Sequence, residues 1–327
     1  MPSYPRRRAL AALALIALAS APATHAQAQA WPDKPVRILV PAPAGSSLDV
    51  LARTIGDRLK DKFNQPVIVE NKPAAGGTVA TAEVAKATPD GSVLLLGFNG
   101  PLATGPLVTK VPYDVQKDLV PVVITSSQPN VLAVNAALPI RNVADLVAWS
   151  KANPGKLNFA SVGNGSSSHL NAELLKSMAG IEAVHVPFNG SPPAVLSTVQ
   201  GETQMIFAVM QPLQAQIQGG KLRAIAVTTP KRFALLPDLP TIAESGYPAF
   251  EALAWNGLVA PAGTPRAVVE KINAEVNAIL KQPEVAQKMN AAGFDLVGGT
   301  PEDFARLMQS ETARWTPVVK KLGITAN

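Results

Sequence analysis

Cysteine is absent from all 327 residues of this chain, and histidine occurs only three times. Without cysteine the protein forms no disulfides and binds no metal through thiolates. His25 lies in an N-terminal leader segment, so His169 and His185 are the histidines left for any catalytic or metal-binding role. Two histidines without a clustered carboxylate do not make a convincing metal site. We therefore expect neither a metal ion nor another cofactor.

Charge clusters and long apolar runs are also scarce. The chain has 29 basic and 23 acidic side chains, and residues 1–30 hold three of the basic ones and no acid, so the remainder carries 26 − 23 = +3. No cluster of lysine or arginine is interleaved with aromatic residues, which argues against nucleic acid as a partner. The one sustained apolar run, Ala9 to about Ala21, is too short to span a membrane.

The first 30 residues have the pattern of a secretory signal peptide. Arg6-Arg7-Arg8 precede the apolar run, and small residues follow it, ending Ala26-Gln27-Ala28-Gln29-Ala30. This order of basic, apolar and small residues predicts export to the periplasm, with cleavage near Ala28 or Ala30. The three arginines leave twin-arginine export open as an alternative to the Sec route. Either way, the mature chain is expected to begin near Trp31.

Beyond the leader, short apolar strands alternate with amphipathic helices. A strand at 36–40 precedes a helix at 48–63, and the same order recurs to about residue 227. Further helices are predicted near three prolines, at 265–281, 283–292 and 301–322. This alternation predicts an α/β fold with open, mostly parallel sheets and helices on both faces. In such sheets, ligands bind beyond the carboxyl ends of the strands.

Three loops that contain glycine with serine or threonine follow strands and open helices, at 41–49, 71–78 and 161–169. A helix N-terminus leaves several N–H groups unpaired and carries partial positive charge, which makes it a site for phosphate or carboxylate. A plain strand-to-helix turn with a serine cap would show the same pattern. Three such loops, divided between parts of the chain that could face one another, favour a cleft for an anion.

Asp49 and the two histidines allow more than one interpretation. Ser46-Ser47-Leu48-Asp49 resembles a capping box, which would make Asp49 a helix-stabilising residue. Alternatively, Asp49 accepts a hydrogen bond from an ammonium or hydroxyl group of a ligand at the cleft mouth, and both roles are compatible. A structural role is the better hypothesis for His169, at a helix start, and for His185, in an apolar strand.

Enzymatic motifs are incomplete. The third loop reads G-x-G-x-x-S, close to a dinucleotide-binding fingerprint, but no acidic residue follows Val186 to bind ribose. No serine stands in a G-x-S-x-G elbow. An exported enzyme that acts on a small organic acid is therefore kept as the alternative, and a protein-binding scaffold as a third class.

Several segments resemble the tripartite tricarboxylate transporter receptor family, the Bug-type periplasmic binding proteins. Glu70-Asn71-Lys72-Pro73-Ala74-Ala75-Gly76-Gly77 is similar to the E-N-x-P-G-A-G-G block of that family, and Ala87-Thr88-Pro89-Asp90-Gly91 to its A-x-P-D-G turn. The other similar segments lie at 31–41, 163–170, 236–246 and 255–265. The resemblance therefore extends in order along the whole mature chain.

The resemblance implies a two-domain receptor of type II that closes on a small organic acid or amino acid and delivers it to the membrane permease subunits of a tripartite transporter. It implies no catalytic activity, and we expect a monomer. The expected domains are residues 31–128 plus 253–327 and residues 129–252, after a signal peptide at 1–30. The discontinuous first domain is implied partly by this resemblance, and a helical tail that packs on the first sheet is also physically reasonable.

In that family, main-chain amides, hydroxyls and waters hold a ligand carboxylate, and the matching positions here lie in the three loops. The family's loop aspartate matches Asp49, and the usual lysine after the strand at 184–186 is replaced by Asn189. The expected ligand-binding residues are Ala44, Gly45, Ser46, Ser47, Asp49, Ala75, Gly76, Gly77, Thr78, Ser161, Gly163, Asn164, Gly165, Ser166, His169 and Asn189. The replacement at Asn189 leaves the identity of the ligand open.

Overall fold

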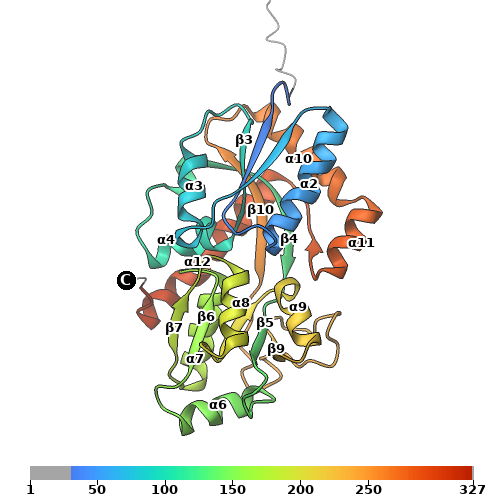
Figure 1. Cartoon of the computed structure of the whole chain (residues 1–327). Coiled ribbons are helices and arrows are strands. Elements are labelled where there is room, and N and C mark those ends of the chain that lie inside the picture. The colour runs from blue at the N-terminus through green and yellow to red at the C-terminus, as the bar shows by residue number, and fades with distance from the viewer. Residues whose placement is uncertain (1–30, 326–327) are drawn as a thin grey trace, which may run out of the picture. The chain divides into compact units, whose positions relative to one another are not determined.

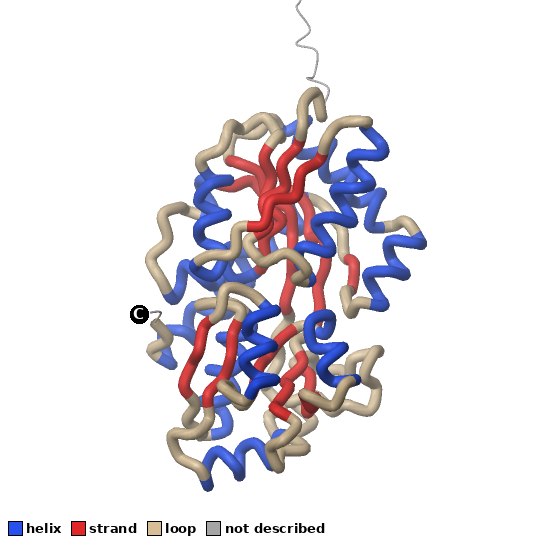
Figure 2. The backbone as a smooth tube through the Cα atoms, in the orientation of Figure 1, coloured by secondary structure: helices blue, strands red, loops and turns tan. Residues whose placement is uncertain are grey.

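The computed structural model describes residues 31–325, and the predicted signal segment lies outside the described residues. In this part of the chain, the strands form two sheets, one above the other in Figures 1 and 2. The six-stranded sheet has the order β11-β4-β10-β3-β1-β2, and the five-stranded sheet has the order β7-β6-β8-β5-β9. Each sheet with its covering helices is called a half: the first half contains the six-stranded sheet, and the second half the five-stranded sheet.

Strand direction explains how the chain passes between the halves. The first sheet contains β1 (Val36–Val40), β2 (Val67–Asn71), β3 (Val93–Phe98), β4 (Leu119–Gln128), β10 (Ala254–Pro261) and β11 (Asp295–Leu296). The second contains β5 (Val131–Asn135), β6 (Asn158–Ser161), β7 (Val184–Pro187), β8 (Met205–Ala208) and β9 (Leu222–Val227). In the first sheet, β1, β2, β3 and β4 are parallel to one another, and β10 and β11 run in the opposite direction. In the second sheet, β6, β7, β8 and β9 are parallel to one another, and β5 runs in the opposite direction. The chain enters the second half on β5, and it returns to the first half on β10.

Helices cover both faces of each sheet. On the first sheet, one face packs against α2 (Ser47–Phe63), α10 (Arg266–Leu280) and α11 (Pro283–Ala291), and the other against α3 (Thr78–Ala85), η2 (Gly100–Thr104) and the start of α12 (Pro301–Leu322). On the second sheet, α6 (Val143–Ala152) and α7 (Ser167–Ala179) cover one face, and α8 (Ser191–Gln200) and α9 (Met210–Gln218) the other. Short helical turns are η1 (Ala75–Gly77), α4 (Gly105–Val108) and α5 (Val115–Asp118).

The two-residue period of the strands builds this layered core. In β1, Ile38 and Val40 pack with the α2 side, whereas Leu39, between them, packs with the α3 and α12 side. Because successive side chains of a strand point to opposite faces, a fully apolar strand is buried on both. In α2, Leu51 and Ile55 recur at helical spacing and form the buried face.

The predicted α/β fold with helices on both faces of its sheets is confirmed, and most strands of each sheet run in one direction, although β5, β10 and β11 add antiparallel pairs. The sequence left residues 99–118 unassigned, where the structure has η2, α4 and α5. These turns are too short to show a helical period, and their prolines and glycines read as loop. No helix of residues 31–325 is long and apolar enough to cross a membrane.

The last helix, α12, contacts both halves. Phe304 and Met308 belong to the core of the first sheet, whereas Trp315 and Val319 belong to that of the second. The apolar face of one long helix therefore joins the two cores. The domain boundaries expected from the sequence stay a prediction.

Candidate ligand-binding site

A cavity lies between the two halves, at the level where the chain crosses from β4 to β5. Its lining consists of apolar, hydroxyl and carboxamide residues. They are Pro41, Ala42, Ser46, Ser47, Leu48, Phe98, Asn99, Gln128, Asn130, Val162, Ser167, Ser168, Gly190, Ser191, Ala208, Val209, Ala254 and Asn256. None of these lining residues has an ionisable side chain, so the walls carry no formal charge.

Strand direction explains why these residues meet. Pro41 directly follows β1, Asn99 follows β3, and Gln128 ends β4. From the second half, Val162 follows β6 and Val209 follows β8. The parallel strands of both sheets therefore direct their carboxyl ends to the cavity, where open α/β sheets bind ligands.

Four helices begin at the cavity wall. α2 begins with Ser47 and α7 with Ser167, each after a serine N-cap, and both of these first residues line the cavity. α8 begins with Ser191, and the N-cap of α9, Val209, also lines the wall. The first N–H groups of a helix have no partner within the helix, and its N-terminus carries partial positive charge. The cavity thus contains positive potential from both halves without a cationic side chain.

The loop before α2 is held by an acidic side chain. Ser46 caps the helix, and its Oγ accepts a hydrogen bond from Asp49 N at 3.3 Å. The Asp49 carboxylate does not complete a capping box but accepts from Gly45 N, one residue earlier, at 2.9 Å. Gly45 has φ +78°, in the left-handed region that favours glycine. The carboxylate of Asp49 therefore stabilises the turn by accepting a hydrogen bond from the main chain of Gly45.

Both oxygens of Asp49 are used within the first half. Arg53 donates to Oδ2 at 3.1 Å and lies 3.0 Å from Oδ1, while Asn71 Nδ2 donates to Oδ1 at 2.9 Å. Burial alone would raise the pKa of Asp49, but the hydrogen bonds from Arg53, Gly45 and Asn71 outweigh it, and the pKa lies below its usual value. Asn71 also donates to Ala42 O at 3.0 Å, which ties the loop to β2. These contacts support a structural role for Asp49 in the turn before α2, although its carboxylate does not form the capping box.

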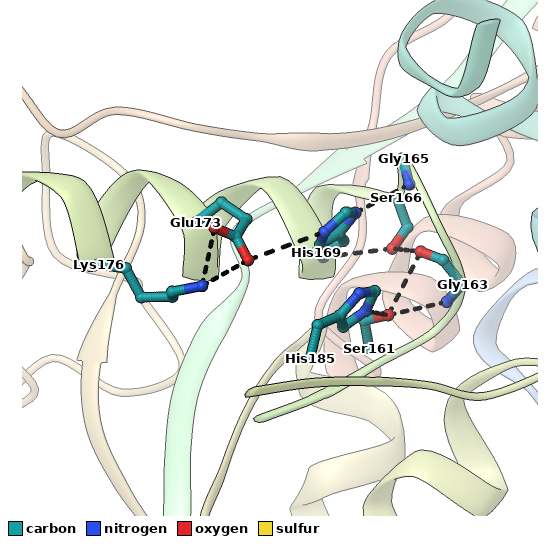
Figure 3. A network of polar contacts seen from close by, with 8 residues as sticks. All are labelled: Ser161, Gly163, Gly165, Ser166, His169, Glu173, Lys176 and His185. Atoms are coloured by element: carbon teal, nitrogen blue, oxygen red, sulfur yellow. Dashed lines mark hydrogen bonds and ion pairs between the residues drawn. The ribbon is translucent and has the colours of Figure 1, made fainter. Parts of the chain in front are cut away.

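The loop before α7 repeats this construction with a histidine, as Figure 3 shows. Ser166 caps the helix and accepts from His169 N at 3.3 Å, and it donates to Gly163 O at 2.6 Å. His169 Nδ1 accepts from Gly165 N at 3.1 Å, the role that Asp49 plays toward Gly45. Gly165 has φ +73°, close to the value at Gly45. Both halves therefore contain the same kind of turn, in which a glycine precedes a serine N-cap and the residue three positions after the serine accepts from the glycine N–H.

His169 belongs to a stack of rings beneath the loop. The His169 and His185 rings lie 3.9 Å apart between centroids and nearly parallel, and Phe159 stacks on His185 at 4.8 Å. Burial, then His185 and the cation of Lys176, lower the pKa of His169 to about 3. Burial and Lys176 lower the pKa of His185 to about 4. Both imidazoles are therefore neutral near pH 7, which leaves Nδ1 of His169 free to accept.

Ser161 and His185 form a contact that resembles a nucleophile and its base. Ser161 Oγ lies 2.6 Å from His185 Nε2. However, the Ser161 side chain is fully buried outside the cavity lining, and its hydroxyl also bonds to Gly163 N and O. The pair therefore fixes the Gly163 turn and does not face the cavity.

Several predicted glycines form the contact between the halves. A Cβ at Gly165 would lie 2.6 Å from Gly105 Cα, and Gly165 O accepts from Thr104 Oγ1 at 2.5 Å. A Cβ at Gly76 would lie 3.0 Å from Asn164 O. By contrast, a Cβ at Gly45 would have no atom within 4 Å. The second loop therefore faces the third across the interface between the halves.

Only two of the residues predicted to bind the ligand, Ser46 and Ser47, line the cavity. The others are not among the lining residues, and their role in binding stays a prediction: Ala44, Gly45, Asp49, Ala75, Gly76, Gly77, Thr78, Ser161, Gly163, Asn164, Gly165, Ser166, His169 and Asn189. Four carboxamides in the lining were not predicted from the sequence, which are Asn99, Gln128, Asn130 and Asn256. Asn99 and Gln128 are polar residues at strand ends, and this position could have marked them as candidates for the site.

Two α/β halves joined by crossing strands, with a cavity at the strand ends, define the class of periplasmic solute-binding proteins. MatC (Rpa3494) from Rhodopseudomonas palustris, solved with bound malate, matches with a TM-score of 0.84 and 31% identity over 88% of this chain and 100% of that one. R. palustris Rpa4515, solved with adipate, matches with a TM-score of 0.87 and 35% identity over 90% and 99%.

The chain belongs to the tripartite tricarboxylate transporter receptor family, whose model matches residues 51–324. Protein BugT from Bordetella pertussis is 35% identical over 97% of this chain and 98% of its own length. The resemblance seen in the sequence motifs is thereby confirmed.

Proposed function

We propose that this protein is an extracytoplasmic receptor that captures a small carboxylate between its two halves and delivers it to a membrane permease. It releases the ligand chemically unchanged. The observation that carries the proposal is the uncharged cavity at which helices from both halves begin. The two relatives solved with adipate and malate support the carboxylate class, since each shares the fold and about a third of the sequence.

The charge distribution favours an anion. A carboxylate in this cavity would meet helix N-termini and serine hydroxyls, and no acidic side chain of the lining would repel it. Each helix N-terminus stabilises a nearby negative charge by about 0.3–1 kcal/mol or more when water is excluded. Because these helices belong to different halves, the anion binds the closed arrangement better than an open one. That difference in affinity is what drives closure.

The remaining assignments follow from this role. Residues 31–128 plus 253–327 and residues 129–252 would be the two moving domains, with the hinge at the β4–β5 crossing and the return before β10. A receptor that delivers to a permease must be exported, which agrees with a signal peptide cleaved near Ala28 or Ala30. We expect it to act as a monomer and to need no cofactor.

A thermal-shift screen of the protein purified from the periplasm tests the proposal. The probes are mono-, di- and tricarboxylates, aromatic acids and amino acids, each beside its neutral primary amide as a control. A true ligand at about 100 times its Kd should stabilise the protein by about 2.7 kcal/mol, and its amide should not. Stabilisation by the amides alone, or by none of the acids, would contradict the proposal. Product formation from a stabilising acid would favour the alternative of an exported enzyme.

A further inference from the structure

Two buried carboxamides in the cavity wall lack hydrogen-bond partners. Gln128 is 2% exposed and Asn130 is 1% exposed, and both line the cavity. Within the described residues, Oε1 of Gln128 and Nδ2 of Asn130 have no partner. A buried polar atom without a partner costs free energy, so such atoms normally meet a water or a ligand. One of the two is an acceptor and the other a donor.

Their backbone is fixed at the crossing between the halves. Gln128 ends β4, opposite Ala254 of β10. Asn130 N donates to Thr228 Oγ1 at 2.9 Å, and Thr228 N donates to Asn130 O at 3.0 Å. The backbone of both residues is therefore held at the crossing, beside the cavity that their side chains line.

The polar atoms of the cavity wall limit which functional groups the ligand can have beside its carboxylate. Gln128 Oε1 requires a donor, which a second carboxylate cannot supply. An ammonium group can donate, but the lining contains no carboxylate to compensate its charge, and burying an unpaired charge is expensive. A hydroxyl group is neutral and can both donate and accept a hydrogen bond, so its chemistry matches the unpartnered acceptor and the unpartnered donor.

We propose that Gln128 and Asn130 select acids that carry a hydroxyl group and that the cavity discriminates against amino acids. This rests on the proposed function, because the acid's carboxylate is assigned to the helix N-termini of the same cavity. The carboxamides would then recognise the rest of the molecule. Asn256 and Asn99 line the same cavity and add two further amides to its wall.

Isothermal calorimetry with matched acids tests the selection. For four and for six carbons, the probes are the unsubstituted acid, its hydroxy analogues, its amino analogues and the dicarboxylate. We expect the best hydroxy acid to bind at least about tenfold more tightly than the unsubstituted acid, the value of roughly one hydrogen bond. The amino analogues should bind most weakly of the four.

Gln128→Met and Asn130→Leu preserve volume and remove the amide. In each variant the preference for the hydroxy acid over the unsubstituted acid should fall by about fivefold to tenfold. Gln211→Met is the matched control, since Gln211 also has an unpartnered buried Oε1 but lies outside the cavity lining. It should leave the preference unchanged. A urea titration of each variant without ligand confirms that it folds.

The outcomes separate this inference from the proposed function. If unsubstituted and hydroxy acids bind equally, if an amino analogue binds best, or if Gln128→Met and Asn130→Leu both keep the full preference, the inference is wrong while carboxylate binding stands. If none of the acids binds, the proposed function fails and the inference with it.

Discussion

The loops before α2 and α7 are built alike but held by different chemistry. In both, a glycine near φ +75° precedes a serine N-cap, and the residue three positions after the serine accepts from the glycine N–H. The acceptor is a charged carboxylate at Asp49 and a neutral imidazole at His169. Each half thus places the start of a helix at the same cavity. An ionised side chain holds the turn before α2, and a neutral side chain holds the turn before α7.

The neighbours of each loop explain the difference. Asp49 can stay ionised when buried because Arg53 and Asn71 donate to it. His169 is packed in a ring stack with Lys176 nearby, where a protonated imidazole would be repelled. A second difference is position, since Gly165 contacts Gly105 of the first half while Gly45 faces open space. At these two glycines, therefore, only the loop before α7 meets the other half.

The largest expected effect tests this asymmetry of position. Gly165→Ala and Gly45→Ala each place alanine at a positive φ, which costs about 1–2 kcal/mol of stability in both. Only Gly165→Ala also meets the other half, so it should weaken binding of an acid found in the thermal-shift screen by about a hundredfold, the size of an overpacking cost of about 2.7 kcal/mol. Gly45→Ala should change affinity by only about threefold or less. Calorimetry measures both.

Solution scattering completes this test. The wild type and Gly45→Ala should shrink when the acid is added, because ligand favours the closed arrangement. Gly165→Ala should remain expanded at the same concentration. Equal loss of affinity in both variants would show that strain in the turn, and not contact between the halves, governs binding.

The next effect concerns the charged acceptor. Asp49→Asn removes the charge that Gly45, Arg53 and Asn71 surround, so the free energy of unfolding without ligand should fall by about 1.5–3 kcal/mol. His169→Asn keeps a neutral acceptor for Gly165 N and should cost less, about 1 kcal/mol. Urea titrations measure both values. A large loss of affinity with unchanged stability in Asp49→Asn would instead assign Asp49 to the ligand.

A third prediction uses pH. His169 and His185 have pKa values of about 3 and about 4 in the folded state, below the ordinary 6.5, so the unfolded chain binds protons first as pH falls. Stability should therefore be full above about pH 6.5 and decline toward pH 4, by up to about 1.4 kcal/mol per pH unit for each histidine. The pKa of Asp49 is lowered, so its contribution is present above about pH 4 and is lost only in stronger acid.

Denaturant titrations at pH 7, 5.5 and 4.5 measure this slope. Glu173, 4.0 Å from His169 Nε2, and Lys176 face the same ring stack, so both belong to the local charge balance. In His169→Asn, the free energy of unfolding should change less with pH, because the contribution of one histidine is removed. A wild-type stability that stays constant between pH 6.5 and 4.5 would contradict burial of two neutral imidazoles.

The smallest effect compares the first residues of the two helices. Ser47→Ala and Ser167→Ala each remove one hydroxyl from the cavity wall, at equivalent positions of α2 and α7. Each should weaken binding of the same acid by about fivefold, the value of a hydrogen bond near 1 kcal/mol. Calorimetry that finds an effect in only one variant would place the carboxylate against that half alone.

Much of this organisation could be predicted from local patterns. The strand at 36–40 and the helix at 301–322 coincide with β1 and α12, because apolar runs, helical periodicity and proline act over a few residues. The serine caps at Ser46 and Ser166 were visible for the same reason. The starts of α8 and α9 have no side-chain cap, which is why the sequence did not mark them as part of the site.

By itself, the sequence determined the α/β fold, the family and the serine-capped turns. The order of strand and helix patterns predicts the fold, motifs along the chain predict the family, and each cap depends on residues a few positions apart. Only the tertiary structure decided which polar groups face the cavity. Gln128 and Asn130 are close to each other in the sequence but far from Asn256, and the pairing of β4 with β10 brings the three amides to one cavity. It also decided that Gly165 meets Gly105, because steric fit between segments 60 residues apart in sequence arises only after both sheets have formed.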